Sequence, residues 1–478
     1  MTSNSDLHST RRRQFLEEIG SAIAVIPAGS EMTRNDDVDH EFRQDSGFFF
    51  LTGFPEPDAI AVLEPDRFTL FVRPRDREME TWNGYRSGVE GAKETFGADE
   101  AYPIKELESV LADRLVGYSD LYFSWGGHLD GRMSAVLRKL PPLHERFGYR
   151  IPFTITDPTP ILSELRLRKS VGEAELLRTA SRISADGHAE AMRFAAPGLY
   201  EYQVQAAMEF VFRQQGSMRN GYPSIVASGS NATVLHYTEN DRQMQDGDLL
   251  LIDAAAEFGY FSADITRTFP VNGRFSGPQR ALYEIVLAAE KAGIAAARPG
   301  ATMRDIHLIC SRILTEGLGE LGLIPLGADE SMAFHHYREF FMHGTGHWLG
   351  MDVHDAGTYQ VDGEHRRLEP GMAFTVEPGI YVRPDSETVK FHLLEYDLDE
   401  WTERRIKLGS KKARGREAED LEKADSVEHT IPPEFRGIGI RIEDDILMTE
   451  TGHENLTGAV PVEIDDIEEL CRTASKLG

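Results

Sequence analysis

Apolar and polar positions follow two periods along the chain, and their alternation predicts its secondary structure. Within residues 1–165, short apolar runs such as SAIAVIP, GFFFLTGF, AIAVLE and FTLFVRP are typical of strands, and stretches of helical spacing lie between them. We predict a helix over 11–19, a strand over 22–26, and helices near 103–115 and 132–139. This alternation indicates a small α/β domain with a mixed sheet.

Helical spacing is more extensive in the second part of the chain, which we predict as a separate domain over 166–478. A stretch with two prolines, 157–161, is interpreted as the linker. One long helical pattern then begins at Leu162 and continues through SVGEAELLRTASRISADGHAEAM. Further helices are predicted over three segments, 202–215, 279–297 and 303–320. Strand-like runs lie between and after these helices, so the predicted fold class of the whole chain is α/β (α+β).

Five potential metal ligands occupy apolar, strand-like stretches of this second domain, where an unpaired charge is costly to bury. They are Asp253, Asp264, His347, Glu377 and Glu443. Two divalent cations would neutralise the four carboxylates, whereas one cation would leave the site over-charged. Oxygen ligands with a single nitrogen favour Mn, Co or Zn over copper, and no thiolate is offered. The sequence therefore suggests a two-metal centre without naming the metal.

Two of these acids, Asp253 and Asp264, flank a predicted turn at 257–259. Antiparallel strands joined by this turn would bring both carboxylates to one end of a hairpin. A lone aspartate at a strand end is more often a cap or a turn residue. The prediction of metal ligands therefore rests on the two aspartates together. Two carboxylates held close without a cation repel each other, and one of them would take up a proton.

The segment HGTGHWLGMDVHD places His343, His347 and His354 among glycines that allow a close approach of the backbone. A single histidine is more often structural than a ligand, but three in one glycine-rich segment favour a functional site. The nearby His335 and His336 are interpreted as surface or loop residues. The motif HExxH is absent, so the helical zinc site of many proteases is not supported.

The ordered segments LHYTEN, IDAAAEFGYFSADITRTF, HGTGHWLGMDVHD, TVEPGIY and RGIGIRIEDD resemble the metallopeptidase family of aminopeptidase P, prolidase and methionine aminopeptidase. The resemblance covers roughly 166–478 and implies a catalytic domain with the pita-bread fold. The segment RQDSGFFFLTGFPEPDAIAVLEP is also similar to the aminopeptidase P branch, which implies that branch's amino-terminal domain over 1–165. Five motifs in the family's order are more specific than any one of them.

The resemblance implies a role for individual residues. The five potential ligands match the family's metal positions, with Asp264 and Glu443 bridging two ions and His347 binding one. The implied catalytic residues are Glu377, His343, His354, His236 and Arg441. The implied substrate-binding residues are His236, His354, Arg441, Tyr381 and Trp82. Trp82 matches a tryptophan that reaches a neighbouring subunit's site in aminopeptidase P; the alternative is a partly buried packing aromatic.

The reaction implied by the resemblance is metal-dependent hydrolysis of an amino-terminal Xaa-Pro bond, with Mn preferred over Co or Zn. We hypothesise that a hydroxide held between two ions attacks the carbonyl and that Glu377 protonates the leaving prolyl nitrogen. His343 and His354 would contact the oxyanion or the substrate backbone. A site shaped around proline's ring can reject other residues by fit. Two alternatives remain open: a prolidase for Xaa-Pro dipeptides, and a pita-bread binding module without catalysis.

Composition and charge narrow the expected partners. The formal net charge of -28 argues against nucleic acid and anionic membranes, so peptides with proline in second position are the expected partners. The resemblance adds a homodimer or homotetramer. No apolar run is long enough to predict a membrane span, and two distant cysteines without CxxC fit a reducing cytoplasm. The start RRRQFLEEIGSAIAVIPAG superficially resembles a twin-arginine export signal, but Glu17 and Glu18 interrupt its apolar core.

One segment departs from the family pattern, because roughly 45 residues, about 386–430, are inserted between EPGIYVRPD and IPPEFRGIGIRIEDD. Their strong charge of mixed sign is typical of a solvated or partly disordered arm. The first part, TVKFHLLEYDLDEWTERRIKL, could form a hairpin or short helix against the body. Because the insertion enters between Glu377 and Glu443, we hypothesise a lid or an oligomer contact. A passive surface insertion is the alternative.

Overall fold

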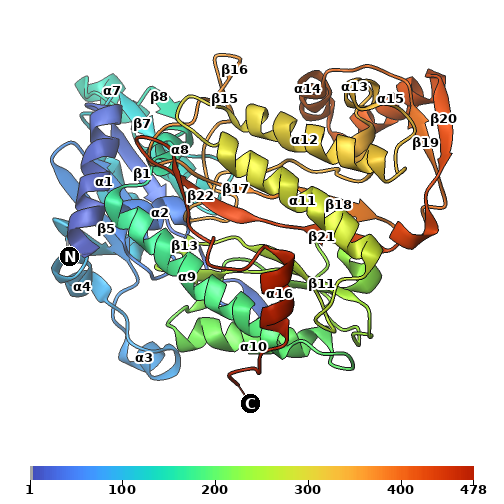
Figure 1. Cartoon of the computed structure of the whole chain (residues 1–478). Helices are drawn as coiled ribbons and strands as arrows, with labels where there is room; N and C mark the ends of the chain where they lie inside the picture. Colours follow the sequence, from blue (N-terminus) through green and yellow to red (C-terminus); the bar gives the residue numbers. More distant parts are fainter. Residues whose placement is uncertain (1–3, 478) are drawn as a thin grey trace. The chain divides into compact units, whose positions relative to one another are not determined.

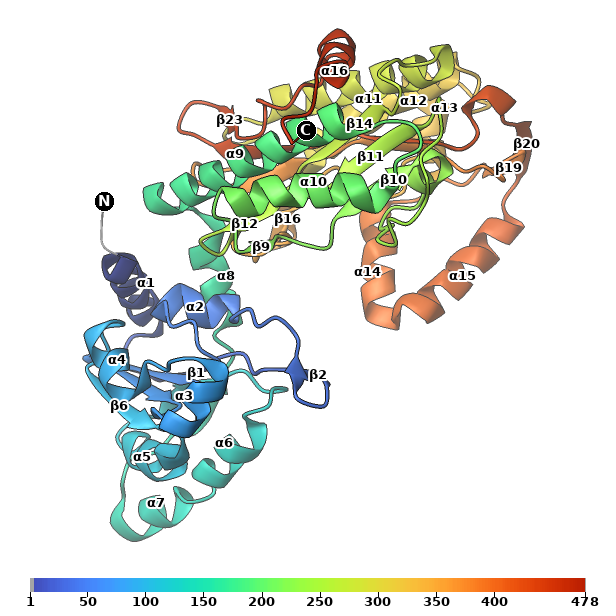
Figure 2. The same ribbon diagram turned by 90° about the horizontal axis from the view of Figure 1, so that it is seen from below.

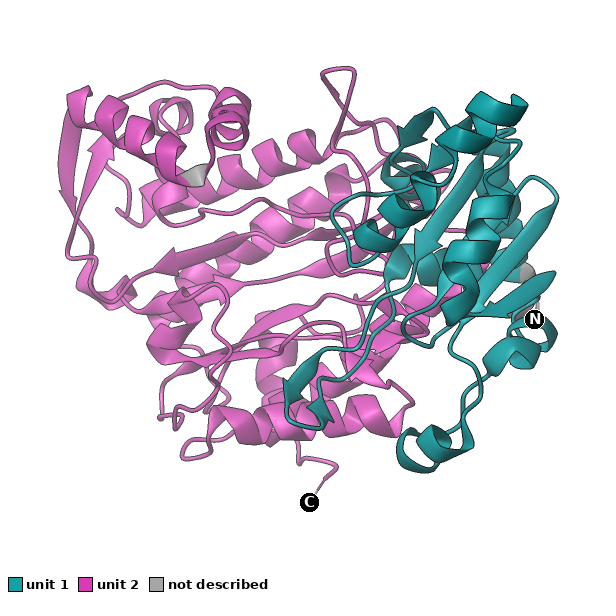
Figure 3. Cartoon of the chain, turned by 180° about the vertical axis from the view of Figure 1, so that it is seen from behind, with its two compact units in different colours: residues 1–166 teal, residues 167–478 magenta. Residues whose placement is uncertain are grey.

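The chain divides into two units, residues 1–166 and 167–478, each with its own hydrophobic core (Figure 3). The structure is a computed structural model that describes residues 4–477. Both units combine helices with strands, so the predicted α/β (α+β) class is confirmed. Each unit is described by itself below.

A six-stranded sheet forms the centre of the first unit, with the strand order β6-β5-β4-β1-β7-β8. β1 pairs antiparallel with β4 and parallel with β7, so the sheet is mixed as predicted. In that order its strands are Glu100–Pro103, Arg67–Val72, Ile60–Glu64, Ile23–Pro27, Asp120–Tyr122 and Thr154–Thr156. A small ribbon joins β2 (Thr33–Asn35) to β3 (Val38–Asp39). The helices of this unit are α1 (Asn4–Ile19), α2 (Ser46–Thr52), α3 (Arg77–Asn83), α4 (Gly88–Glu94), η1 (Ile104–Glu106), α5 (Leu107–Arg114), α6 (Asp130–Leu137) and α7 (Pro141–Phe147).

The predicted linker at 157–161 is wrong, because α8 (Thr159–Leu167) begins inside it. The Asp157 carboxylate accepts hydrogen bonds from both the backbone N–H and the hydroxyl of Thr159, so it caps the start of this helix. The single long helix predicted from Leu162 is also interrupted after α8. A capping box between Ser170 and Glu173 starts a new helix, α9 (Val171–Phe194).

Two helical pairs enclose the strands that carry the predicted ligands in the second unit. Figure 1 and Figure 2 show these strands between the pair α9 and α10 (Glu201–Gln214) and the pair α11 (Gly277–Ala296) and α12 (Met303–Glu320). The predicted helices at 202–215, 279–297 and 303–320 are therefore confirmed to within two residues. Among the described residues, every helix is too short or too polar to cross a membrane. Shorter helices are η2 (Gly229–Thr233), α13 (Ala328–Ala333), η3 (His336–Glu339), η4 (Pro433–Phe435) and α16 (Ile464–Cys471).

Four antiparallel pairings position the strands that bear the predicted ligands. β11 (Leu249–Asp253) lies between β10 (Ile225–Ser228) and β14 (Thr266–Pro270), and Asp253 is opposite Thr266. β17 (Ala373–Val376) pairs with β22 (Asp444–Met448), and β18 (Gly379–Val382) pairs with β21 (Ile438–Arg441). Glu377 and Glu443 therefore occupy matching breaks between consecutive strands. The remaining strands are β9 (Arg219–Asn220), β12 (Ala256–Phe258), β13 (Phe261–Ser262), β15 (Gln360–Val361), β16 (Glu364–His365) and β23 (His453–Asn455).

The turn between Asp253 and Asp264 lies slightly later than predicted. Phe258 is opposite Phe261 in the β12–β13 ribbon, so Gly259 and Tyr260 form the turn. Both have positive φ, 59° and 69°, which is the backbone conformation that a tight hairpin turn requires. The antiparallel arrangement that brings the two aspartates to one end of a hairpin is as predicted.

The insertion is folded rather than partly disordered, and the short helix predicted for its first part is present over 398–408. β19 (Thr388–His392) pairs with β20 (Ser426–Thr430), and α14 (Leu398–Leu408) and α15 (Ser410–Lys423) form a helical hairpin between them (Figure 2). Arg405 makes two hydrogen bonds of 2.9 Å to Glu417, and these ion-paired charges explain why a strongly charged sequence folds as helices.

The surface assignment of His336 is wrong, because its ring is buried and lies 3.0 Å from the His392 carbonyl.

Candidate metal centre

One cavity of about 570 Å³ in the second unit collects the predicted ligands. Asp253 ends β11, Asp264 precedes β14, Glu377 follows β17 and Glu443 precedes β22. Because these strand ends meet, acids far apart in the sequence reach the same space. The predicted site residues that line this cavity are Asp253, Asp264, His347, Glu377, Glu443, His236, His343, His354 and Arg441.

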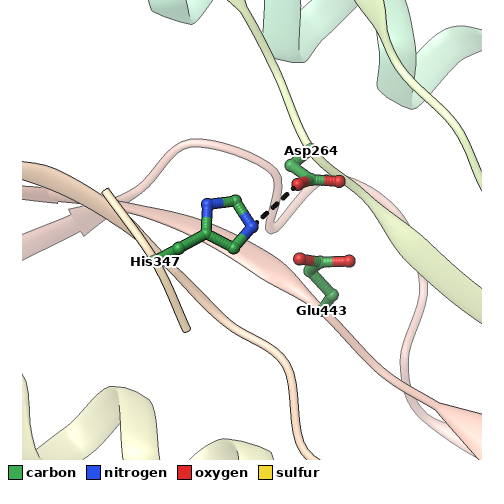
Figure 4. Close-up of side chains that lie close together, drawn as sticks. All are labelled: Asp264, His347 and Glu443. Carbon is green, nitrogen blue, oxygen red and sulfur yellow. Dashed lines mark ion pairs between the residues drawn. The ribbon is translucent and has the colours of Figure 1, made fainter. Parts of the chain in front are cut away.

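His347 lies close to two of the carboxylates in the cavity. Its Nε2 lies 3.3 Å from Asp264 Oδ2 and 3.7 Å from Glu377 Oε1. Ligand atoms of Asp264, His347 and Glu443 all lie within 4.8 Å of one another, and Figure 4 shows the three side chains pointing toward a common centre. This spacing allows one cation to contact all three residues.

Close backbone packing holds His347 in place. Its N–H donates to Thr375 Oγ1 at 3.1 Å, and its carbonyl accepts the N–H of Thr375 at 3.0 Å, so the segment runs against β17. A Cβ on the preceding residue, Gly346, would lie 1.9 Å from the Thr375 carbonyl oxygen. Only glycine allows this approach, and the same strand, β17, delivers Glu377.

Burial and mutual repulsion raise the pKa values of three carboxyl groups in the cavity. Burial is the largest cause for Asp264, for Glu377, whose pKa rises to about 7, and for Glu443, whose pKa rises well above its usual value. Burial opposes the charge on His347, but the hydrogen bond and charge of Asp264 outweigh it and raise the pKa of His347 to about 9. Acids crowded in this way suit divalent cations, which would take the place of the protons.

Two hydroxyl groups hold the carboxylates, and the sequence patterns did not identify either of them. The Tyr222 hydroxyl lies 2.6 Å from Asp253 Oδ1 and 2.5 Å from Asp264 Oδ1, so it can donate its hydrogen to either. The Thr266 hydroxyl donates to Glu443 Oε2 at 2.5 Å. Tyr222 lies in GYPS, an ordinary turn sequence, and only the fold places it beside the acids.

A hydrogen-bonded chain connects Arg441 to His343. Arg441 donates to Asp253 through Nη2 and to the Tyr381 hydroxyl through Nη1, the latter at 2.8 Å. The Tyr381 hydroxyl lies 2.8 Å from His343 Nε2, and His343 Nδ1 lies 2.7 Å from the Gly344 carbonyl. Nδ1 therefore donates and Nε2 accepts. Burial, together with the charge of Arg441, lowers the pKa of His343 to about 3, so its ring is neutral.

His236 and His354 are exposed at the cavity, and neither ring makes a hydrogen bond to any residue within 4–477. The ring of His354 packs edge-on against His347, with 4.2 Å between centroids. Partial burial and the neighbouring charge of His347 lower the pKa of His354. Both rings are thus free to contact a ligand in the cavity.

The predicted residue Trp82 lies on α3 of the first unit. Its side chain is 81% exposed. The alternative that Trp82 is a partly buried packing aromatic of its own unit is therefore wrong.

Comparisons with known proteins agree with this geometry. The model of metallopeptidase family M24 matches residues 175–450, and that of the aminopeptidase P amino-terminal domain matches 8–122. Xaa-Pro aminopeptidases of Haemophilus influenzae and Escherichia coli are 39% and 40% identical, covering 97% and 98% of this chain and 96% and 98% of theirs.

Solved structures are similar over the same length. Aminopeptidase PepP of Pseudomonas aeruginosa superposes with a TM-score of 0.87 at 40% identity, covering 98% of each chain. Zinc-substituted aminopeptidase P of Escherichia coli, in complex with product, gives 0.87 at 37%, covering 98% of this chain and 99% of that one. The chain thus belongs to metallopeptidase family M24, with the pita-bread catalytic fold and an aminopeptidase P amino-terminal domain.

Proposed function

We propose that this metallopeptidase removes the first residue of peptides that have proline in second position. The observation that carries the proposal is the convergence of four acids, four histidines and Arg441 on one cavity. The Xaa-Pro aminopeptidases that are 39% and 40% identical over nearly the whole chain support the specificity.

Asp253, Asp264, His347, Glu377 and Glu443 are the residues that would hold two divalent ions. Four carboxylates and one imidazole favour Mn, with Co or Zn as alternatives. Divalent ions in such a site supply an activated water and polarise the substrate carbonyl. Zinc is the ion named for the similar Escherichia coli structure.

Glu377 is proposed to move the proton that the leaving prolyl nitrogen requires. Its carboxyl group lines the cavity, so it faces the space in which a substrate would lie. His236 and His354 present free ring nitrogens to the cavity and are proposed to bind the substrate backbone. His343 and Arg441, joined through Tyr381, are proposed to orient the substrate.

Prolidase activity, restricted to dipeptides, is the second candidate. A human Xaa-Pro dipeptidase is 33% identical over 94% of this chain, which is lower than the bacterial aminopeptidases. Comparing hydrolysis of Arg-Pro-Pro with that of Ala-Pro distinguishes the two activities. We expect cleavage of Arg-Pro-Pro after arginine, whereas cleavage of Ala-Pro alone would support prolidase. A binding module without catalysis predicts hydrolysis of neither peptide.

We further propose a homo-oligomer, either a dimer or a tetramer, in which Trp82 reaches a partner's site. The support within this chain is the 81% exposure of the Trp82 side chain. A location in the cytoplasm is proposed from Cys310 and Cys471, which are both free thiols.

A further inference from the structure

A second cavity, of about 340 Å³, adjoins the active-site cavity within the second unit. Its walls come from α12, the short helix η3, the segment 343–346 and α14 of the insertion. His343, Gly344 and Gly346 line both cavities, so this segment is their common wall. The insertion therefore contributes directly to a space beside the metal centre.

Thr345 connects the two sides of the common wall. Its hydroxyl lies 2.8 Å from Nδ1 of His307, a residue that lines the second cavity. Its carbonyl accepts the backbone N–H of Glu377, a predicted metal ligand, at 2.8 Å. Thr345 thus links a residue of the second cavity, His307, to the backbone of Glu377.

The charge of this cavity is opposite to that of the whole chain, whose formal net charge is -28. Arg304 and Arg338 line it, and Asp399 is the one acid among its lining residues. Arg304 lies 3.6 Å from Asp399. The half-buried side chain of Arg338 makes no hydrogen bond or ion pair with any residue in the described range 4–477. A cation in this position is available to an anionic ligand.

His307 does not add positive charge to this cavity. Burial is the main cause that lowers the pKa of His307 to about 4, and the charges of Arg304 and Arg338 lower it further. His307 is therefore neutral at physiological pH, and the two guanidinium groups provide the field.

The lining favours a carboxylate over other anions. The planar fork of an arginine matches the two oxygens of a carboxylate. Asp399 repels a doubly charged phosphate more than a single carboxylate. Met303, Met342 and Leu398 provide apolar surface for the organic part of such a ligand. We propose that this arginine cavity binds a carboxylate beside the active site, with Arg338 as its main contact.

The carboxylate has two chemical sources. It can belong to a peptide whose amino terminus lies at the metal centre, which rests on the proposed function, or to a free organic acid. Each source requires its own experiment. Both use the full chain, with Arg338→Gln as the test variant and Arg338→Lys as the conservative variant. Arg274→Gln is the matched control, because Arg274 is exposed and does not line the cavity.

The first experiment compares Ala-Pro-Ala-Asp with Ala-Pro-Ala-Asn-amide, which has no carboxylate, on the metal-loaded enzyme. For the acidic peptide, Arg338→Gln should raise KM about tenfold with kcat unchanged, because a charge-assisted hydrogen bond is lost. Lysine should restore part of the affinity. For the amide peptide, Arg338→Gln should have the same KM as wild type. Arg274→Gln should have the wild-type KM for both peptides. These two controls distinguish a lost carboxylate contact from a damaged fold.

The second experiment measures succinate binding by thermal shift on the metal-depleted chain, where no bound metal can hold a carboxylate. A saturable rise in melting temperature should occur in wild type and Arg274→Gln and disappear in Arg338→Gln. A response to succinate alone assigns the cavity to free organic acids. If wild type cleaves no Xaa-Pro peptide, the proposed function fails, and the succinate experiment alone tests the carboxylate site. Equal behaviour of wild type and Arg338→Gln in both experiments overturns the carboxylate site.

Discussion

At the scale of single residues, the centre depends on a phenol as well as on its ligands. The Tyr222 hydroxyl lies within 2.6 Å of both Asp253 and Asp264, so it fixes the orientation of two acids. We expect Tyr222→Phe to fold normally but to weaken metal binding by about 10- to 100-fold. Metal titration of the depleted protein measures this loss. Tyr283→Phe, whose hydroxyl instead donates to the Val462 carbonyl, should bind metal as wild type does. Unchanged affinity in Tyr222→Phe would show that the ligands orient themselves.

The proposed proton transfer depends on the carboxyl group of Glu377. Replacing it with the amide of Glu377→Gln should lower kcat by about 100-fold or more, because general acid–base catalysis typically contributes that much. Turnover is measured together with metal content, since Glu377 is also a predicted ligand. The exposed Glu387 of the insertion provides the control, and Glu387→Gln should be fully active. Near-normal turnover of Glu377→Gln with full metal occupancy would rule out the proton-transfer role.

The acids that line the cavity could be singled out from the sequence because acids are anomalous in apolar runs. Glu443, for example, is 2% exposed, and such burial needs compensation. Tyr222 and Thr266 could not be predicted in this way. Hydroxyl groups are common in turns and strands, and their partners here are set by the pairing of distant strands. A sequence pattern therefore identifies acids that are costly to bury more readily than the hydroxyl groups that form hydrogen bonds with them.

At the scale of elements, α9 supports the end of β11 through a buried histidine. His188 Nε2 donates to the Ala254 carbonyl at 2.7 Å, next to Asp253, and burial lowers the pKa of His188 to about 4. In the unfolded chain the pKa is about 6.5. As the pH falls, His188 therefore takes up a proton in the unfolded state before it does so in the folded state. The free energy that neutral His188 contributes to folding is lost as the pH falls from about 6.5 to 4.

The histidine's effect can be measured by urea unfolding of the metal-depleted chain at pH 7 and pH 5. Wild type should lose roughly 2 kcal/mol more than His188→Gln between these pH values, because glutamine does not titrate. An equal loss in both proteins would mean that His188 titrates normally in the folded state. The comparison between variants cancels the other groups that titrate over the same range.

Element boundaries were predictable where the sequence carries its own stop and start signals. α12 begins and ends as predicted, and Thr302 and Asp305 form the capping box at its start. The start of α8 was missed because prolines hid the cap by Asp157. The second helix of the insertion, α15, was missed for another reason: the Arg405–Glu417 pair joins it to α14, and mixed charge alone does not reveal such pairing.

At the scale of the whole molecule, the family and both kinds of domain could be predicted from the order of the motifs. The two family models and a relative that covers 98% of this chain confirm this prediction. The arginine cavity did not follow from composition. A net charge of -28 describes an average surface, and the fold gathers Arg304 and Arg338 from separate segments beside the insertion. Local charge at a site therefore requires the tertiary structure.

The most direct test of the central claim is peptide hydrolysis by the metal-depleted protein as Mn is added back. Mass spectrometry of the products from Arg-Pro-Pro and from Arg-Ala-Pro gives the position of each cut. We expect no cleavage without metal, release of arginine from Arg-Pro-Pro alone, and a rate that reaches its maximum at two ions per chain. A metal-saturated protein that leaves Arg-Pro-Pro intact, or that cuts Arg-Ala-Pro equally well, would contradict the proposed Xaa-Pro aminopeptidase.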